Sequence, residues 1–481
     1  MVTCFMGDGD MPASSKLSCA VAVALAVASG TASAAQFDYS LFAGINHSDN
    51  IDLTQNNTIS ESVLIPGFNF TYSQLGSTLQ TNVAGTLEYY DYLGNGFNNQ
   101  TFVQLTGKAN WTVLPQRLDF TVQDFAGVQP LSTLASDAPN NLQQTNVLAL
   151  GPILHFRLSN TLRGEAELDY INSYASKTKE FNSSRGQGVL RFLKDLGPTD
   201  VLSVNLESQR VNFYDTGSPP PAEINGIPDV DLTTNIPNYT RNEVFARYVR
   251  TLAHFNLDVS LGWSQIDFSG VPSASTPLAR ATLSWQPTPR SNLAITASHQ
   301  YSDAAQDIMM QPGQIIAGAG AQLDNNAIGT VGLTGPQGQT SPGGINTGDL
   351  VIDPEVYLDQ SLGADYTFTT DRWTLSAAPL YSRLSYLNDP TFNQTDRGAS
   401  AGVSYRVTAL VSVSVFADGE RYTYHSLDRR DDTSDYGVSL TDRRTPHWSW
   451  QVSLTHRQRD STASGQSYSE NEIYFGVVFK R

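Results

Sequence analysis

Cysteine is almost absent from this chain. Among 481 residues there are two, Cys4 and Cys19, and both precede the position at which we expect the mature protein to begin. A mature chain without cysteine excludes a disulfide-stapled scaffold and any metal site built on thiolates. The fold must therefore belong to a class that needs neither.

Positive charge is also scarce. Lys and Arg number 29 against 46 Asp and Glu, which gives a formal net charge of −17. Binding to nucleic acid requires a basic surface, so nucleic acid is excluded as a partner. Only 16% of the residues are charged and 40% are hydrophobic, which is too polar for a membrane protein built of helices. A membrane β-barrel has such a composition because half of each strand faces water.

Beyond its first residues the chain lacks a long apolar run. The short apolar segment Leu17 to Ala28 precedes Ala32-Ser33-Ala34, an A-x-A cleavage site. We therefore predict a secretory signal peptide over residues 1–34. Because Met1 to Asp10 contains acids and no base, we expect translation to start at Met11. No apolar stretch after the cleavage site reaches the length of a transmembrane helix.

What the chain does contain is alternation. From Trp448 to Thr455 every even position is apolar and every odd position is polar. Successive side chains of a strand point to opposite faces, so this segment has one apolar face and one polar face. The same pattern recurs in Leu79–Tyr89, Leu162–Tyr170, Leu257–Trp263, Val411–Val415 and Ile473–Phe479. Behind a secretory signal, this pattern predicts a barrel with lipid outside and water inside.

The connections between the expected strands alternate between short and long. Leu114-Pro115-Gln116 and Thr369-Thr370-Asp371 are tight, whereas Ala126–Leu142 and Phe213–Asn238 are long. Outer-membrane barrels have this rhythm because their periplasmic turns are short and their external loops are longer. We predict an all-β fold: a single transmembrane antiparallel up-and-down β-barrel of about 18–20 strands over residues 35–481. Its expected location is the outer membrane of a Gram-negative bacterium. The alternative is a secreted β-solenoid or sandwich, whose strands would also alternate but would bury the apolar face in a core; no fixed internal repeat supports a solenoid.

Two loops could carry chemistry. The Gly-rich loop of about residues 302–354 is long enough to fold into the lumen, and we expect an external position with partial infolding. A loop over Ser426–Ser434 is expected to bring Asp428, Asp431 and Asp432 together near His425. Its mixed charges favour pairing within the loop or with lipid phosphates. We predict no catalytic residue, no cofactor and no metal site, because the histidines lack metal-ligand spacing.

Charged residues on the expected strands indicate which face encloses the lumen. An arginine on the lipid face would cost about 2–4 kcal/mol at the bilayer midplane, so these residues are expected inside. The predicted lumen-lining residues are Arg163, Glu165, Glu167, Asp169, Arg185, Arg191, Arg241, Glu243 and Arg247. A simple register would set Glu165 opposite Arg191. Such residues could stiffen the wall as ion pairs or form a polar path for a neutral or weakly charged solute, and the two roles are compatible.

Aromatic side chains are also expected on the inner face, among them Tyr90, Phe102, Phe125 and Phe245. They could stack on sugar rings. We favour the alternative that they lie in interfacial girdles or pack against infolded loops.

Several local motifs resemble one family. The motifs are His47-Ser48-Asp49-Asn50-Ile51, Pro139 to Asn146 followed by Gly151-Pro152, Ser284 to Ser291, and Arg459-Asp460-Ser461 with Glu470-Asn471. Together they resemble the putative β-barrel porin 2 family, in particular its exopolysaccharide-operon (EpsL-type) members. The likeness spans nearly all of the mature chain, although each motif alone is loose. The chain departs from the pattern at Glu472, where a basic residue is expected, and in its ending, Phe479-Lys480-Arg481.

The resemblance implies an outer-membrane barrel linked to exopolysaccharide export and biofilm matrix. The leading hypothesis is a passive conduit for polysaccharide, driven by synthesis machinery in the periplasm and inner membrane. The alternatives are a general small-solute diffusion porin and a surface enzyme or receptor, and we expect that the protein is not an enzyme. The expected partners are outer-membrane lipid, polysaccharide or small polar solutes, and periplasmic polysaccharide-export components.

Overall fold

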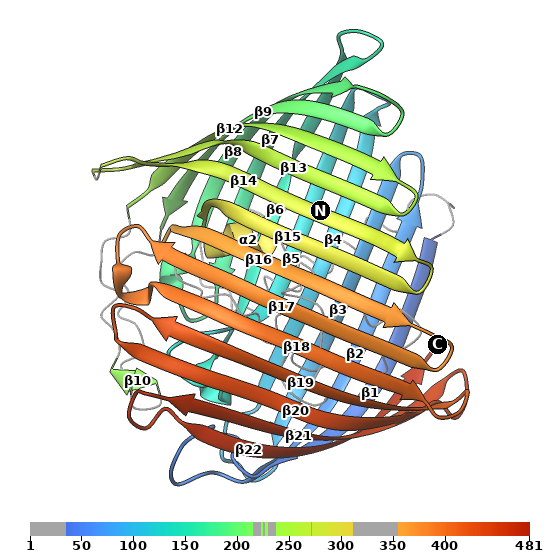
Figure 1. The fold of residues 1–481 in the computed structure, drawn as a ribbon, viewed down its shortest axis with the longest axis vertical. Helices are drawn as coiled ribbons and strands as arrows, with labels where there is room; N and C mark the ends of the chain where they lie inside the picture. Colours follow the sequence, from blue (N-terminus) through green and yellow to red (C-terminus); the bar gives the residue numbers. More distant parts are fainter. Residues whose placement is uncertain (1–34, 215–222, 225–226, 229–236, 271, 311–354) are drawn as a thin grey trace, which may run out of the picture.

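The protein forms a closed β-barrel (Figure 1). The computed structural model describes residues 35–214, 223–224, 227–228, 237–270, 272–310 and 355–481. Within these residues a single antiparallel sheet of 20 strands curves round on itself, which confirms the predicted fold class and strand number. The predicted signal peptide, residues 1–34, and most of the Gly-rich loop, residues 311–354, lie outside the described residues.

The barrel strands are β1 (Ala35–Ser48), β2 (Glu61–Leu75), β3 (Leu79–Tyr92), β4 (Gln100–Leu114), β5 (Leu118–Pro130), β6 (Leu142–Arg157), β7 (Leu162–Ala175), β8 (Ser183–Asp195), β9 (Asp200–Phe213), β12 (Tyr239–Leu252), β13 (Phe255–Phe268), β14 (Ala274–Thr288), β15 (Ser291–Ser302), β16 (Tyr357–Thr369), β17 (Trp373–Tyr386), β18 (Gln394–Arg406), β19 (Val411–Tyr424), β20 (Arg429–Asp442), β21 (Trp448–Ser461) and β22 (Tyr468–Lys480). The loop elements are β10 (Glu223–Ile224), β11 (Ile227–Pro228), helix α2 (Ala304–Met310) and the 3-10 turns η1 (Pro139–Asn141), η2 (Lys179–Phe181) and η3 (Pro390–Phe392).

Each barrel strand pairs with its neighbours in the chain, and β9 pairs with β12. The barrel closes where β1 pairs with β22, from Ser40 opposite Lys480 to Ser48 opposite Glu472. Closure leaves the described 20-stranded sheet without an open edge, as a strand fold in lipid requires. Both ends of the barrel chain meet at one rim, together with tight turns such as residues 253–254. We call this rim the turn rim, and the opposite rim, which carries the longer connections, the loop rim.

The strands are long enough to span a bilayer. They range from 12 residues in β15 to 16 residues in β6. At about 3.4 Å per residue and a tilt near 45°, a strand of this length projects over roughly 30 Å of membrane. Among the described residues no helix is long and apolar enough to cross a membrane.

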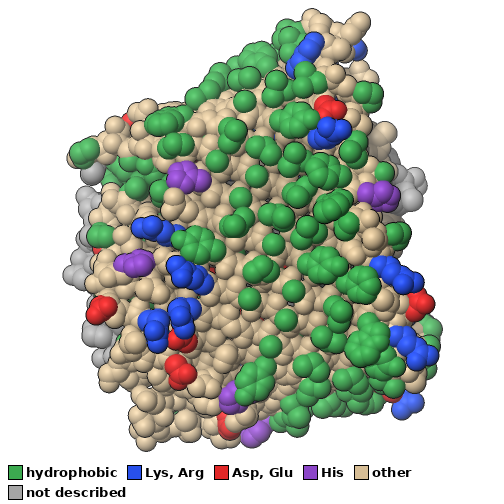
Figure 2. Space-filling view, viewed as in Figure 1, with side chains coloured by type: hydrophobic (Ala, Val, Ile, Leu, Met, Phe, Trp, Pro, Cys, Tyr) green, Lys and Arg blue, Asp and Glu red, His purple; other side chains and the backbone are tan. Residues whose placement is uncertain are grey.

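The outer surface of the barrel is apolar. Leu168, Leu261 and Val244 leave 66%, 60% and 47% of their surface exposed when no lipid is present. Figure 2 shows hydrophobic side chains spread over the outer face of the strands, while charged side chains gather towards the strand ends. The neighbours that point inward are polar, for example Glu243 and Gln209, which are buried. This is the predicted arrangement, with apolar residues towards lipid and polar residues towards the lumen.

Two predicted loop boundaries were wrong. Strand β5 continues to Pro130, so the connection to β6 is shorter than the predicted Ala126–Leu142. Strand β20 begins at Arg429, so Asp431 and Asp432 lie within a strand and not in a loop over Ser426–Ser434. The predicted pairing within this segment is nevertheless present, because Arg429 pairs with Asp431 and Arg430 with Asp432. Polar residues occupy both faces of a strand near the loop rim, which hides the alternation there.

Candidate functional site: the lumen and its infolded segments

The connection between β5 and β6 crosses the lumen. We call residues 131–138 the strap. Leu134, Ala135 and Ala138 in the strap are buried. Tyr424 of β19 donates its hydroxyl hydrogen to the carbonyl oxygen of Thr133 over 3.2 Å. Because β19 lies far around the barrel from β5, the strap spans the lumen and divides it.

Two arginines hold the strap by its backbone. Arg429 of β20 donates from Nη2 to the carbonyl oxygen of Leu134 over 2.7 Å. Arg459 of β21 donates from Nη1 to the carbonyl oxygen of Ala135 over 3.0 Å. Both guanidinium groups also bind the carboxylate of Asp431, at 2.7 Å for Arg429. We call Arg429, Asp431 and Arg459 the latch.

The carboxylate of Asp431 is fully buried. Besides the two guanidinium groups it accepts a hydrogen bond from Ser461 Oγ at 2.5 Å. Charge-assisted hydrogen bonds of this kind are about twice as strong as neutral ones. A guanidinium carries five donors in a planar fork, so one arginine can bind a carboxylate and a carbonyl oxygen at the same time.

An aromatic pocket surrounds the side chain of Leu134. Its members are Tyr357, Tyr386, Phe392 and Tyr424. Tyr357 and Tyr386 lie with their ring centroids 5.2 Å apart. The strap is therefore anchored twice at its far end, through carbonyl oxygens at the latch and through an apolar side chain in this pocket.

At its origin the strap is closed by Asn141, whose side chain is fully buried. Its Nδ2 donates to the carbonyl oxygens of Ser132 and Ser136 at 2.8 Å and 2.9 Å. Its Oδ1 accepts from the backbone N–H of Ser132 at 2.9 Å. One amide side chain thus satisfies backbone groups that lack strand partners, as buried polar groups require.

Gln143 and Gln144, which follow Asn141 in the motif Pro139 to Asn146, replace backbone hydrogen bonds that are missing between neighbouring strands. Pairing between β4 and β5 ends at Leu105 and Ala126. The amide of Gln144 then binds both the N–H and the carbonyl oxygen of Val103 in β4, at 3.0 Å and 2.7 Å. Gln143 donates to Thr178 Oγ1 at 2.8 Å, which ties β6 to the following loop. The polar run in the motif Pro139 to Asn146 is explained by these bonds.

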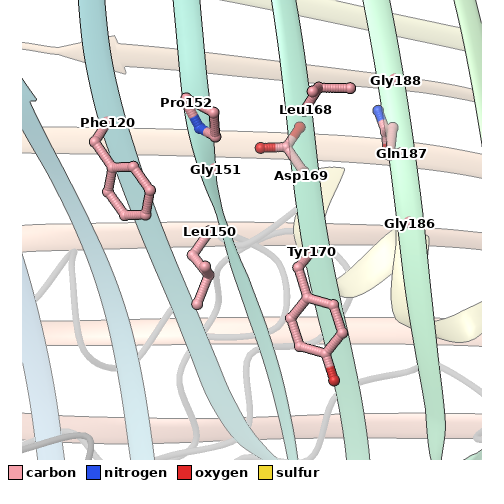
Figure 3. Close-up of a pocket in the computed structure, with 10 residues that line it drawn as sticks. All are labelled: Phe120, Leu150, Gly151, Pro152, Leu168, Asp169, Tyr170, Gly186, Gln187 and Gly188. Atoms are coloured by element: carbon pink, nitrogen blue, oxygen red, sulfur yellow. The ribbon is translucent and has the colours of Figure 1, made fainter. Parts of the chain in front are cut away.

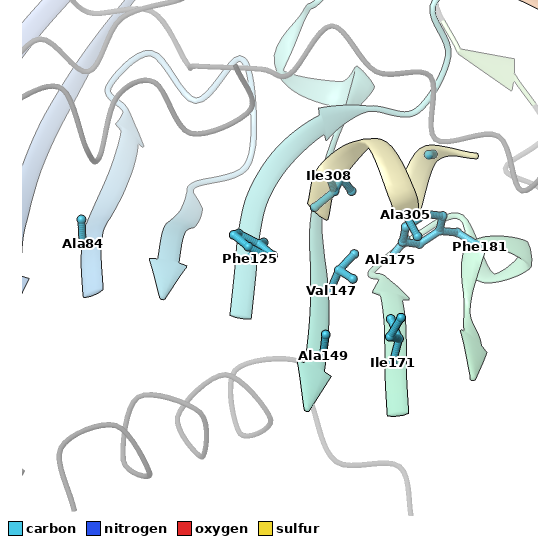
Figure 4. Close-up of a cluster of buried hydrophobic side chains, with 10 residues drawn as sticks. Ala84, Phe125, Val147, Ala149, Ile171, Ala175, Phe181, Ala305 and Ile308 are labelled. Atoms are coloured by element: carbon cyan, nitrogen blue, oxygen red, sulfur yellow. The ribbon is translucent and has the colours of Figure 1, made fainter. Parts of the chain in front are cut away.

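A second segment folds into the lumen at the start of the Gly-rich loop. Helix α2 packs against the inner wall formed by β5, β6 and β7, where Ala305 and Ile308 meet Phe125, Val147 and Ile171 (Figure 4). The predicted partial infolding of this loop is confirmed for residues 303–310. The remainder of the loop lies outside the described residues.

Acidic side chains fix helix α2 to the wall. Asp303 accepts two hydrogen bonds from Arg185 Nη1, at 2.7 Å and 2.8 Å, and one from the Tyr239 hydroxyl at 2.6 Å. Asp307 accepts from the hydroxyls of Tyr357, at 2.5 Å, and Ser302. Asp303 thus faces a positive charge, whereas the partners of Asp307 are neutral hydroxyls.

This difference separates the pKa values of the two carboxyls. Burial alone would raise the pKa of Asp303, but the charges of Arg185 and Arg241 and the hydrogen bonds outweigh it and hold the pKa below the usual value. Burial raises the pKa of Asp307 to about 7, and the negative charge of Asp359 adds to that rise. Near neutral pH, Asp307 is therefore the titrating group of helix α2.

The predicted lumen residues of β7 and β8 form a connected set. Glu165 lies directly opposite Arg191, which confirms the register inferred from the sequence. Arg191 Nη1 lies 2.7 Å from Glu167 and 3.8 Å from Glu165. Near the turn rim, Arg163 pairs with Asp195 at 3.0 Å.

The side chain of Asp169 packs closely against Gly151 of the adjacent strand, where there is no room for a Cβ atom. A Cβ atom on Gly151 of the adjacent strand would stand 2.6 Å from Asp169 Oδ1 and closer still to the carbonyl oxygen of Leu168. Any larger residue at Gly151 would therefore displace both groups. The Gly151-Pro152 pair of the motif coincides with this close approach.

The predicted residues of β12 pair with neighbours in β13 and β14. Glu243 lies 3.6 Å from Arg241 Nε and 2.8 Å from Arg280 Nη2. Arg247 Nε donates to Asp258 at 2.9 Å. The structure thus gives each predicted arginine an acidic partner, while the role of these residues as lining for a solute remains a prediction.

Exposure of these wall charges changes along the barrel. Near the loop rim the side chains of Arg185 and Arg241 are 3% and 7% exposed. Towards the turn rim those of Arg191 and Arg247 are 28% and 46% exposed. These charged groups therefore meet solvent towards the turn rim and are covered by neighbouring groups near the loop rim.

The inner aromatic residues pack against other groups. Tyr90 and Phe102 form an edge-to-face pair with centroids 5.6 Å apart. Phe125 contacts the α2 cluster, and the guanidinium of Arg280 lies 5.5 Å from the ring centre of Phe245. All four rings are buried, so packing, and not stacking on an open sugar site, accounts for them.

A second charged wall, on β20, β21 and β22, was missed in the sequence. Arg457 lies 3.6 Å from Asp435, 3.4 Å from Glu470 and 3.1 Å from Glu472. The sequence signal was present, because charged residues occupy alternate positions at Arg457 and Arg459 in β21 and at Glu470 and Glu472 in β22. Glu472, the departure from the family pattern, is one of the partners that Arg457 binds.

One cavity of about 540 Å³ opens on the outer surface, between β5 and β8 (Figure 3). Outward-facing apolar residues, including Phe120, Leu150 and Leu168, line it, and Gly186 and Gly188 leave room for it. It therefore faces lipid and is not part of the lumen. Among the described residues no group of three or more His, Cys, Asp or Glu side chains is placed to hold a metal ion.

Comparison with known proteins supports the family resemblance. Residues 394–481, which form β18 to β22, match the family model described as putative beta-barrel porin 2, the family that the sequence motifs resemble, while the likeness to its exopolysaccharide-operon members stays a prediction. No match was found among curated proteins. The family match and the closed barrel with an apolar outer surface place the protein in the outer membrane as an integral protein.

Solved barrels resemble this one in part. The FrpB iron transporter from Neisseria meningitidis (F3-3 variant) is 10% identical and covers 92% of this chain and 82% of its own, with a TM-score of 0.43. The siderophore receptor PirA from Pseudomonas aeruginosa is 11% identical, with coverages of 94% and 81% and a TM-score of 0.41. OccK2 (OpdF) from Pseudomonas aeruginosa is 8% identical, with coverages of 92% and 98% and a TM-score of 0.35.

Proposed function

We propose that the protein is a passive outer-membrane channel for polar solutes of little net charge, with polysaccharide as its principal cargo. The observation that carries this proposal is the inner wall of β7, β8 and β12 towards the turn rim. There the charges of both signs are paired, and their side chains remain partly exposed to the lumen, as for Arg191 and Arg247. A wall of paired charges is wet but exerts little net field on a neutral chain.

The driving force for export would come from elsewhere. The lumen offers a path, and nothing in the described wall couples movement to an energy source. Periplasmic polysaccharide-export components are therefore the proposed partners, acting from the turn rim, which we expect to face the periplasm. The resemblance to exopolysaccharide-operon members supports this choice of cargo.

The channel is tested by planar-bilayer recording of the purified mature protein. We expect discrete conductance steps with weak selectivity between small cations and anions. The absence of any conductance would contradict the channel. Cargo is tested in the source organism by deleting the gene and measuring secreted polysaccharide, which we expect to fall and to recover on complementation.

A general small-solute porin is the second candidate. The strap favours it, because a segment that crosses the lumen narrows the path for a thick polymer. A deletion strain with normal secreted polysaccharide but slower uptake of small sugars would support this candidate over export.

A further inference from the structure

We propose that the strap is a fixed size filter and that the latch residues Arg429, Asp431 and Arg459 determine the largest solute that passes. This inference rests on the proposed channel function and identifies the residues that set its cutoff. It starts from the contacts that join residues 131–138 to the opposite wall.

Contacts to the wall hold the backbone of the strap at three successive residues. The carbonyl oxygens of Thr133, Leu134 and Ala135 each accept a hydrogen bond from a wall side chain. A carbonyl oxygen that faced an open lumen would find water instead. Fixing these three oxygens sets the path of the chain across the lumen, independently of most strap side chains.

The chemistry of the latch makes this attachment permanent. A guanidinium stays protonated at all physiological pH values. Asp431 is buried and binds both guanidinium groups, so the arginines are held in place as well as charge-compensated. Removal of a partner from such a buried set leaves uncompensated charge, which typically costs several kcal/mol. The strap therefore does not swing freely as a gate would.

The contacts that hold the two ends of the strap can be removed independently by mutation. The origin is held by Asn141 through bonds within the strap. The far end is held by the latch and by the pocket around Leu134. Loss of the latch should release the far end while the origin stays in place, so the strap relaxes towards its own wall and the passage widens.

A matched control lies one residue away on the outer face. Asp432 binds Arg421 and Arg430, at 2.5 Å and 3.2 Å, as Asp431 binds the latch arginines. The side chains of this outer pair are 56% and 54% exposed, and the residues alternate in face with the latch. The double substitution R421A/R430A also removes two positive charges, from β19 and β20, without touching the strap.

The test compares R429A/R459A, R421A/R430A and the unaltered full-length mature protein in planar bilayers. Conductance is recorded with neutral polyethylene glycols of increasing size, and the size at which a polymer no longer enters defines the cutoff. We expect R429A/R459A to conduct more and to shift the cutoff to larger polymers, whereas R421A/R430A keeps the original cutoff. Folding of each variant is checked by its heat-modifiable migration in gels.

A second variant covers the case in which R429A/R459A does not fold. Leu134→Gly leaves the wall intact and removes only the side chain in the aromatic pocket, so we expect a smaller shift in the same direction. An unchanged cutoff in folded R429A/R459A, or in Leu134→Gly alone if the double variant fails, would overturn the filter. Absence of conductance in the unaltered protein would instead overturn the channel itself, and the filter with it.

Discussion

The two infolded segments are held to the barrel in opposite ways. The strap accepts hydrogen bonds through its backbone, and the charged groups, Arg429 and Arg459, belong to the wall. Helix α2 presents its own charged groups, Asp303 and Asp307, to partners on the wall. The position of the strap is therefore set by residues far along the chain, whereas that of α2 depends on its own acids and on pH.

The largest effect is expected where the α2 anchor is broken. Arg185→Ala removes the only arginine that hydrogen-bonds the buried carboxylate of Asp303 among the described residues, which should cost about 3–5 kcal/mol. We expect the amides of residues 304–310 to exchange with solvent much faster, as measured by hydrogen–deuterium exchange in detergent. The control is Arg163→Ala, whose exposed pair with Asp195 should contribute roughly 0–1 kcal/mol. Equal exchange in both variants would show that Asp303 does not anchor the helix.

A smaller effect is expected at the origin of the strap. Asn141→Ala removes three hydrogen bonds and leaves backbone groups of Ser132 and Ser136 without this partner, at a cost of about 1–3 kcal/mol. The N–H of Ser132 should exchange faster, while that of Ala305 in α2 keeps its rate. Substitution of the exposed neighbour Asn140 serves as the control. If Asn141→Ala also released α2, the two segments would be one unit and the comparison would fail.

The smallest expected effect is a pH dependence of the docking of helix α2 to the barrel wall. Asp307 faces Tyr357 and Asp359 on β16 and Ser302 and Asp303 on its own segment. Its pKa rises from 3.8 to about 7 in the docked state, so the docked helix binds the proton more tightly than the released one. Docking is then strongest below about pH 4, weakens as the pH rises and reaches its minimum above about pH 7.

This dependence is measured by exchange of the α2 amides, corrected for intrinsic rates, between pH 5 and 8. We expect it to be much reduced in Asp307→Asn. The strap holds a carboxyl of its own, Asp137, near Arg459, so any pH trend of the strap amides should be the same with and without this substitution. A pH dependence of the α2 amides that persisted in Asp307→Asn would contradict the assignment of Asp307 as the titrating anchor.

Much of the barrel could be predicted from alternation alone. Leu168 has a charged residue on each side, and a strand between lipid and water gives that pattern a physical reason. The opposition of Glu165 and Arg191 followed from assuming simple antiparallel pairing of β7 with β8, and this register holds although residues 176–182, with the turn η2, join the two strands. Local rules sufficed because each strand contacts its neighbours in the chain.

The strap could not be predicted in this way. Its path depends on Arg429 and Arg459, which lie 295 and 324 residues after their partners Leu134 and Ala135, and no local sequence pattern joins these positions. Helix α2 was predictable in part, because Ala304 to Met310 contains good helix formers. The latch itself was hidden by the assignment of Asp431 to a loop.

The central claim is that successive residues of each barrel strand face lipid and water alternately, and that the barrel encloses a lumen that holds solvent. Because both cysteines lie ahead of residue 35, the predicted mature chain contains no native cysteine. A single introduced cysteine is then the only group that a thiol reagent labels. The direct test is to label Arg247→Cys and Val244→Cys, both on β12, with a small water-soluble maleimide in intact outer membranes. The account predicts rapid labelling of Arg247→Cys and none of Val244→Cys; equal labelling of the two, or labelling of Val244→Cys alone, would contradict it.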